Sequence, residues 1–75
     1  MEATVKRIIA DILGIDETTI NNESSPDNVE EWDSLKHMNI IIAIEEEFNL
    51  TFSDEEIGDM LNVQLIIYTL NEKKQ

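Results

Sequence analysis

Apolar residues recur every three or four positions near both ends of the chain, and this spacing predicts amphipathic helices there. The first helix is expected over about residues 4 to 13, and Gly14 follows it in the position where a left-handed residue commonly ends a helix. The last helix is expected over about residues 63 to 72, after Asn62 as a candidate N-cap. A short helix over residues 54 to 59 is predicted because Ser53 and Glu56 have the spacing of a capping box.

The helix expected over residues 34 to 48 carries more apolar surface than one buried stripe requires. Placed at about 100° per residue from Leu35, its apolar side chains form two groups, at roughly 140° to 240° and roughly 300° to 360°. The first group is expected in the core: Ile40, Ile41, Ile44 and Phe48. The second is expected to form an exposed strip that begins beside Ser34: Leu35, Met38 and Ile42. The alternative is that the preceding loop covers this second group.

Residues 15 to 33 show no helical or strand periodicity, and polar residues with Pro26 dominate them. A connection this long in a small protein is usually functional or disordered. Ile15, Ile20, Val29 and Trp32 are spaced as intermittent apolar anchors. We therefore expect an ordered crossover loop with a short helical turn, in an all-α protein of three longer helices and a short third helix.

The composition limits the class of protein. Seventy-five residues predict a single domain over residues 1–75, near the lower limit for folding on a hydrophobic core alone. The chain has no cysteine and one histidine, so we expect neither a disulfide nor a metal site. No apolar run reaches the roughly 18 residues that a membrane span needs, and no signal-peptide pattern is evident. We expect a soluble cytoplasmic protein.

Acidic residues outnumber basic residues by 17 to 5, for a formal net charge of −12. Lys36 is the single base between residues 8 and 72. Nucleic acid is excluded as a partner because its phosphates would be repelled. A basic protein surface is the complementary partner, although the charge could also serve solubility alone.

Ser34 is the candidate site of chemistry. Asp33 before it is a good N-cap residue, because its carboxylate can accept from backbone N–H groups of the first helical turn. Ser34 then lies at the positive end of the helix dipole, which favours an anion on its hydroxyl. Behind it, Glu45 and Glu46 border the apolar strip, a pattern that matches a partner groove with an apolar centre and a basic rim.

The triplet Asp33-Ser34-Leu35 at a helix entrance, after a long loop, resembles the attachment motif of acyl and peptidyl carrier proteins. The resemblance extends over nearly the whole chain. Residues 8 to 14 look like the family's first helix and its stop, and residues 43 to 48 are similar to its second-helix ending. Residues 53 to 56 and 63 to 64 resemble the starts of its third and fourth helices.

The resemblance implies a small four-helix bundle of the acyl-carrier type that is not an enzyme. A separate phosphopantetheinyl transferase would convert the Ser34 hydroxyl to a 4′-phosphopantetheine phosphodiester from coenzyme A, whose thiol carries acyl or aminoacyl groups as thioesters. It also implies partner enzymes that load, elongate or transfer acyl groups and that dock through basic patches. The carrier itself is expected to be a monomer. By position, the docking residues are Asp33, Leu35, Met38, Ile42, Glu45 and Glu46.

The sequence departs from carriers of fatty-acid synthesis, which commonly have Gly-Ala before the triplet and an acid just after it. Here Glu31-Trp32 precede the triplet and Lys36 follows it, Asn39 replaces a frequent acid, and Pro26 takes the place of a large apolar residue. These departures favour a carrier for a dedicated pathway, such as modified sugar, polyketide, nonribosomal peptide or lipid tailoring. Val29 and Trp32 are expected to replace the packing lost at Pro26.

Three alternative functions are compatible with parts of the sequence. A catalytic pair of Ser34 and His37 lacks a third orienting group and a glycine-rich oxyanion loop, and His37 falls at roughly 200°, on the core-facing side. A calcium-binding loop is disfavoured because residues 16 to 27 contain neither its central glycine nor its final glutamate. An unmodified acidic interaction module or inhibitor stays open.

Overall fold

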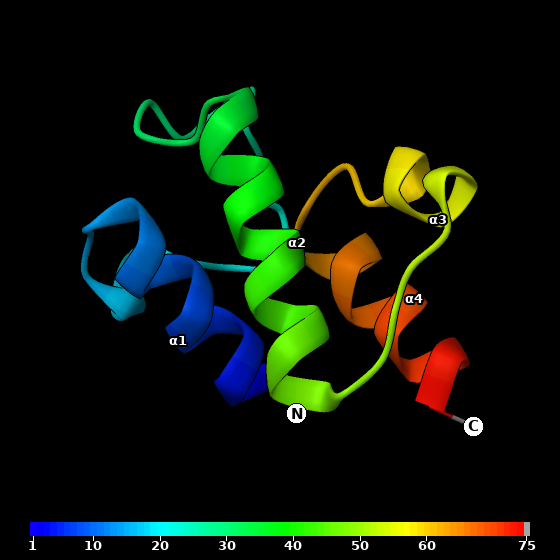
Figure 1. Cartoon of the computed structure of the whole chain (residues 1–75). Coiled ribbons are helices and arrows are strands. Elements are labelled where there is room, and N and C mark those ends of the chain that lie inside the picture. Colours follow the sequence, from blue (N-terminus) through cyan, green and yellow to red (C-terminus); the bar gives the residue numbers. More distant parts are fainter. Residues whose placement is uncertain (75) are drawn as a thin grey trace.

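The computed structural model describes residues 1–74, and in this part of the chain all regular structure is helical (Figure 1). The elements are α1 (Glu2–Leu13), a short 3₁₀-helix η1 (Glu17–Thr19), α2 (Ser34–Phe48), α3 (Asp54–Asp59) and α4 (Val63–Lys74). This confirms the predicted all-α fold of three longer helices and a short third helix, arranged as a small carrier-type bundle. None of these helices is long and apolar enough to cross a membrane.

The helix ends follow the local sequence signals. Gly14 ends α1 in the left-handed region at φ 70°, and its N–H donates to the carbonyl of Ala10 at 2.8 Å. Asn49 ends α2 in the same region at φ 55°, a conformation that asparagine tolerates better than most residues. At the start of α4, the side chain of Asn62 accepts the N–H of Leu65, which confirms the predicted cap.

Helix α2 stands in the middle of the bundle, with α1 on one side and α3 and α4 on the other (Figure 1). Its first turn lies at the opposite end of the molecule from both chain termini. Ile40, Ile41 and Ile44 are fully buried as predicted, whereas Phe48 is only partly buried against the core. The core also includes Met60, directly after α3, which the helical pattern did not identify.

The long loop is ordered, as expected, by hydrogen bonds from its own polar residues. Asp16 caps η1 by accepting from the N–H of Thr18 at 2.9 Å. Further along, the carbonyls of Asn22 and Ser24 each accept, at 3.0 Å, an N–H from the first turn of α4. The loop therefore satisfies backbone donors at a helix start that would otherwise lack partners.

Two apolar side chains of the loop are buried in the core, Ile20 and Trp32, and Val29 is partly buried against it. Pro26 is exposed. Trp32 and Val29 thus provide loop packing that Pro26 does not, as predicted.

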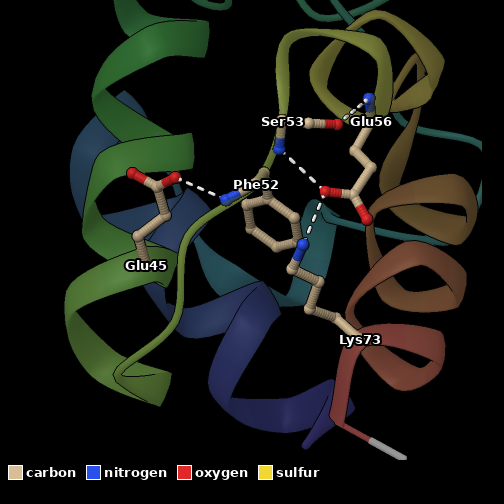
Figure 2. A network of polar contacts seen from close by, with 5 residues as sticks. All are labelled: Glu45, Phe52, Ser53, Glu56 and Lys73. Carbon is tan, nitrogen blue, oxygen red and sulfur yellow. Dashed lines mark hydrogen bonds and ion pairs between the residues drawn. The ribbon is translucent and has the colours of Figure 1, made fainter.

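A chain of polar contacts ties the second half of the bundle together (Figure 2). Glu45 of α2 accepts the backbone N–H of Phe52 at 2.8 Å. Ser53 and Glu56 form the predicted capping box at the start of α3. Lys73 of α4 donates to the Glu56 carboxylate at 2.8 Å, so the connection between α2 and α3 is fixed at both of its sides.

Candidate functional site

Ser34 is the first residue of α2, and its side chain is exposed. Asp33 is the N-cap, as predicted: its carboxylate accepts the N–H of Lys36 at 2.8 Å, and its carbonyl accepts that of His37 at 2.9 Å. The cap fixes where the helix begins and therefore where the Ser34 hydroxyl stands relative to the helix axis. The nearby N–H groups of the first turn and the helix dipole make this end of α2 favourable for an anion.

A groove with a volume of about 400 Å³ opens beside Ser34, between the start of α2, the long loop and the segment that follows α3. Its lining is mostly apolar, and consists of Pro26, Asp27, Ser34, His37, Met38, Met60 and Leu61. The groove therefore places the polar Ser34 hydroxyl at the edge of an apolar surface. Met60 and Leu61 are the members that the sequence analysis missed, because they lie outside any periodic helix.

Trp32 and His37 form a polar pair next to this groove. The indole N–H of Trp32 donates to Nδ1 of His37 at 3.0 Å, with the two ring centroids 5.8 Å apart. Trp32 is 2% exposed and His37 is half-buried. Burial lowers the pKa of His37 from its usual value, so the neutral ring is favoured. The helical angle alone predicts simple packing for His37 and does not indicate Trp32 as its hydrogen-bond partner.

The predicted apolar strip on α2 is exposed rather than covered by the long loop. The exposed fractions are 69% for Leu35, 42% for Met38 and 47% for Ile42. Leu61, across the groove from α2, is 65% exposed and enlarges the apolar surface near Ser34. This disposition leaves the strip free to contact another protein.

The two acidic residues predicted to border the strip differ in environment. Glu46 is exposed. Glu45 is half-buried, and its carboxylate is engaged by the N–H of Phe52 (Figure 2). Glu45 therefore has a structural contact that the sequence did not reveal, in addition to its negative charge.

Lys36, the single base between residues 8 and 72, turns away from the strip. Its ammonium donates to the carbonyl of Ile12 at 3.3 Å, near the C-terminal end of α1. A cation is favourable there because the carbonyl end of a helix is negative. The surface on the other side of α2 thus keeps its acidic character.

The family model described as "Phosphopantetheine attachment site" matches residues 3–65. The match covers most of the chain, and the chain belongs to this family. Its members carry a covalently attached 4′-phosphopantetheine, which supplies a flexible arm ending in a thiol. The protein is thus a phosphopantetheine-dependent carrier.

The residues around Ser34 are suited to such a group. The exposed hydroxyl can be esterified without disturbing the core, and the helix N-terminus tolerates the single negative charge of a phosphodiester. The Asp33 carboxylate, the nearest anion in sequence, accepts the backbone N–H of Lys36 through one of its oxygens. The adjoining groove offers apolar surface against which an arm can lie.

Proposed function

We propose that Ser34 is the attachment residue, and that the chain holds acyl or aminoacyl intermediates as thioesters on a phosphopantetheine arm. The observation that carries this proposal is the exposed Ser34 hydroxyl at the first turn of α2, beside the groove. A separate transferase would form the phosphodiester from coenzyme A. The residues of this chain hold and present the group, and the chemistry on the cargo belongs to partner enzymes.

The fold supports this role by giving the arm a rigid base. Asp33 fixes the helix start, and Ile40, Ile41 and Ile44 anchor α2 in the core. A flexible tether on a rigid docking element raises the effective concentration of its cargo at whichever enzyme is bound. Helix α2 would therefore determine both where the arm begins and which partner receives it.

We propose that partner enzymes dock on α2 through Leu35, Met38 and Ile42, with Asp33, Glu45 and Glu46 supplying charge. The exposure of the three apolar residues supports this surface. The net charge of −12 favours partners with basic patches, and steers them most strongly at low salt. Of the two glutamates, Glu45 accepts the N–H of Phe52 whereas Glu46 is exposed, so Glu46 should contribute mainly to docking.

We further propose that this single carrier domain serves a dedicated biosynthetic pathway in the cytoplasm rather than housekeeping fatty-acid synthesis. Two residues that depart from fatty-acid carriers have defined places here. Lys36 contacts α1, and Trp32 supports His37 at the groove. The surface around Ser34 is therefore built differently from one that carries an acid after the triplet.

Mass spectrometry of the protein isolated from its native host tests the carrier function against the alternative of an unmodified interaction module. A carrier is expected to show a population with phosphopantetheine and an additional acyl or aminoacyl mass that hydroxylamine releases. The mass of that adduct identifies the cargo class. A chain that remains unmodified in cells where its pathway is active would favour the interaction module.

A further inference from the structure

His37 lies three residues after Ser34 on α2, and both side chains line the same groove. Side chains at this spacing are neighbours on a helix surface, about 5–6 Å apart at Cβ. A group attached to the Ser34 hydroxyl would therefore begin within reach of the imidazole ring. A contact with that group requires a ring nitrogen that carries a hydrogen and has no other partner.

Trp32 determines which ring nitrogen is available. Because Nδ1 of His37 accepts the indole N–H, the neutral ring must carry its own proton on Nε2. Within residues 1–74 no buried side-chain nitrogen or oxygen lacks a hydrogen-bond partner, and Trp32 occupies only Nδ1. Nε2 is therefore open to solvent, and its N–H can donate to an incoming group.

The groove contains few other donors. Its lining includes the acceptor Asp27 and four apolar or thioether side chains, which leaves Ser34 and His37 as the side chains that carry a donor hydrogen. Esterification removes the hydrogen from the Ser34 hydroxyl. His37 is then the one side chain of the groove lining that can donate to the attached group.

The charged groups around His37 do not compete for this role. The carboxylate of Asp33 accepts from the backbone of Lys36, and the ammonium of Lys36 is directed to Ile12 of α1. Asp27, in the loop across the groove, is an acceptor and would repel an anion. Among the side chains that line the groove, His37 is therefore the donor available to a group on Ser34, and Trp32 holds its ring in place.

We propose that His37 is a positioning residue for the group on Ser34, donating from Nε2 to an oxygen of the phosphodiester. This proposal rests on the attachment at Ser34. The contact would hold the first bonds of the arm against the groove, toward Met60 and Leu61, instead of leaving them free to rotate in solvent. Trp32 acts through His37 by fixing the tautomer and the ring orientation.

The test uses protein loaded by a broad-specificity phosphopantetheinyl transferase with coenzyme A, with loading confirmed by intact mass. A phosphodiester keeps one charge between about pH 5 and 8, whereas histidine titrates there. Because His37 is the one histidine of the chain, its ring ¹⁵N signals are unambiguous. We expect the ³¹P shift of the loaded protein to change with the same midpoint as these signals, and the midpoint of His37 to be higher in loaded than in unloaded protein.

Three variants make the test specific. His37→Gln keeps an acceptor for Trp32 and should load fully, but its ³¹P shift should no longer change over this pH range. Trp32→Phe should keep the ³¹P response while the unloaded protein shows a mixture of ring tautomers in place of the Nε2–H form. Lys36→Gln removes a nearby cation that does not face the groove, and its ³¹P response should match that of the natural sequence.

Each result decides between distinct claims. A loaded protein whose ³¹P shift is flat while His37 titrates would overturn the positioning role and leave the attachment intact. A ³¹P response that persists in His37→Gln would also overturn it. Failure of the natural sequence to load would overturn the attachment at Ser34, and with it this inference.

Discussion

Glu45 accepts a hydrogen bond at 2.8 Å from the backbone N–H of Phe52, seven residues further along the chain. The contact joins the last turns of α2 to the connection that leads to α3 (Figure 2). Phe52 is itself buried, so the bond also helps to hold its ring in the core. An acidic residue that sequence alone places on the docking surface thus has a structural role.

Substitutions at Glu45 and Glu46 should separate stability from docking. Glu45→Ala leaves the part-buried N–H of Phe52 without its acceptor and is expected to cost about 1–2 kcal/mol in the free energy of unfolding. Glu45→Gln keeps an acceptor oxygen and should cost less. Glu46→Ala, at an exposed position, should stay within about 0.5 kcal/mol while slowing turnover by partner enzymes. Urea unfolding measures the first effect, and equal stabilities for Glu45→Ala and Glu46→Ala would contradict it.

The apolar strip on α2 should be dispensable for folding. Met38→Ala is expected to cost about 1 kcal/mol or less, because the side chain is 42% exposed. Ile41→Ala, on the core face of the same helix, should cost about 2–5 kcal/mol. Turnover of the loaded carrier should nevertheless fall in Met38→Ala. If urea unfolding gave Met38→Ala a cost like that of Ile41→Ala, the strip would be structural.

His37 should make stability depend on pH near neutrality. Because burial lowers its pKa in the folded protein, the unfolded chain binds the proton first as pH falls below about 6.5. Its contribution is therefore complete above that pH and declines as the pH falls toward the lower pKa of the folded state. Protonation at Nδ1 would also break the bond from Trp32, the single tryptophan, so its fluorescence should change in the same window.

His37→Gln is the comparison that isolates this effect. Carboxylates and overall charge repulsion change stability with pH in both proteins, so the difference between the two curves belongs to His37. We expect the natural sequence to lose stability relative to His37→Gln as pH falls from about 7 to 5. Urea unfolding measures the free energy of unfolding of each protein at each pH. A constant difference between the two proteins across this range would show that the environment of His37 does not oppose its protonation.

The pair of Lys73 and Glu56 should contribute at neutral pH and less in acid. The bond from Lys73, with the N–H of Ser53, holds the pKa of Glu56 below its usual value of 4.5. The stabilisation is therefore present above about pH 4.5 and is lost as pH falls through the lower pKa of the folded state. Lys73→Gln should be less stable than the natural sequence at pH 7, by a margin that shrinks in acid.

Lys74→Gln is the matched control for that prediction, because it removes the same charge from the same helix end. The ammonium of Lys74 lies 5.6 Å from the ring centroid of Phe48, and a phenyl ring does not titrate. The destabilisation caused by Lys74→Gln should therefore not shrink in acid in the way expected for Lys73→Gln. Identical pH profiles for the two variants would mean that general charge repulsion, rather than the pair, sets the profile.

Local signals in the sequence were sufficient for most of the fold. The bounds of α2 and α3 follow from caps beside periodic residues, at Asp33 and Ser53. The N-terminal end of α1 and the C-terminal end of α4 could not be predicted from such signals. α1 begins at Glu2, ahead of the first apolar residue of its stripe, and α4 extends to Lys74 through contacts with Glu56 and Phe48 on other helices.

The candidate site could be predicted only in part from the sequence, because the positions of its residues depend on tertiary packing. The helical angles of α2 correctly separated exposed Leu35, Met38 and Ile42 from the buried isoleucines. The groove needed the loop and the segment after α3 to be placed in space, so Met60 and Leu61 were missed. The pairing of Trp32 with His37 likewise depends on where the loop meets α2.

The most direct test of the account is the mass gained on incubation with a phosphopantetheinyl transferase and coenzyme A. The natural sequence should gain about 340 Da, the mass of one phosphopantetheine group, and peptide mapping should place it at Ser34. Ser34→Ala should gain nothing. Ser53→Ala, at another exposed serine beside a helix start, should gain as much as the natural sequence. No gain in the natural sequence, or an equal gain in Ser34→Ala, would contradict the central claim.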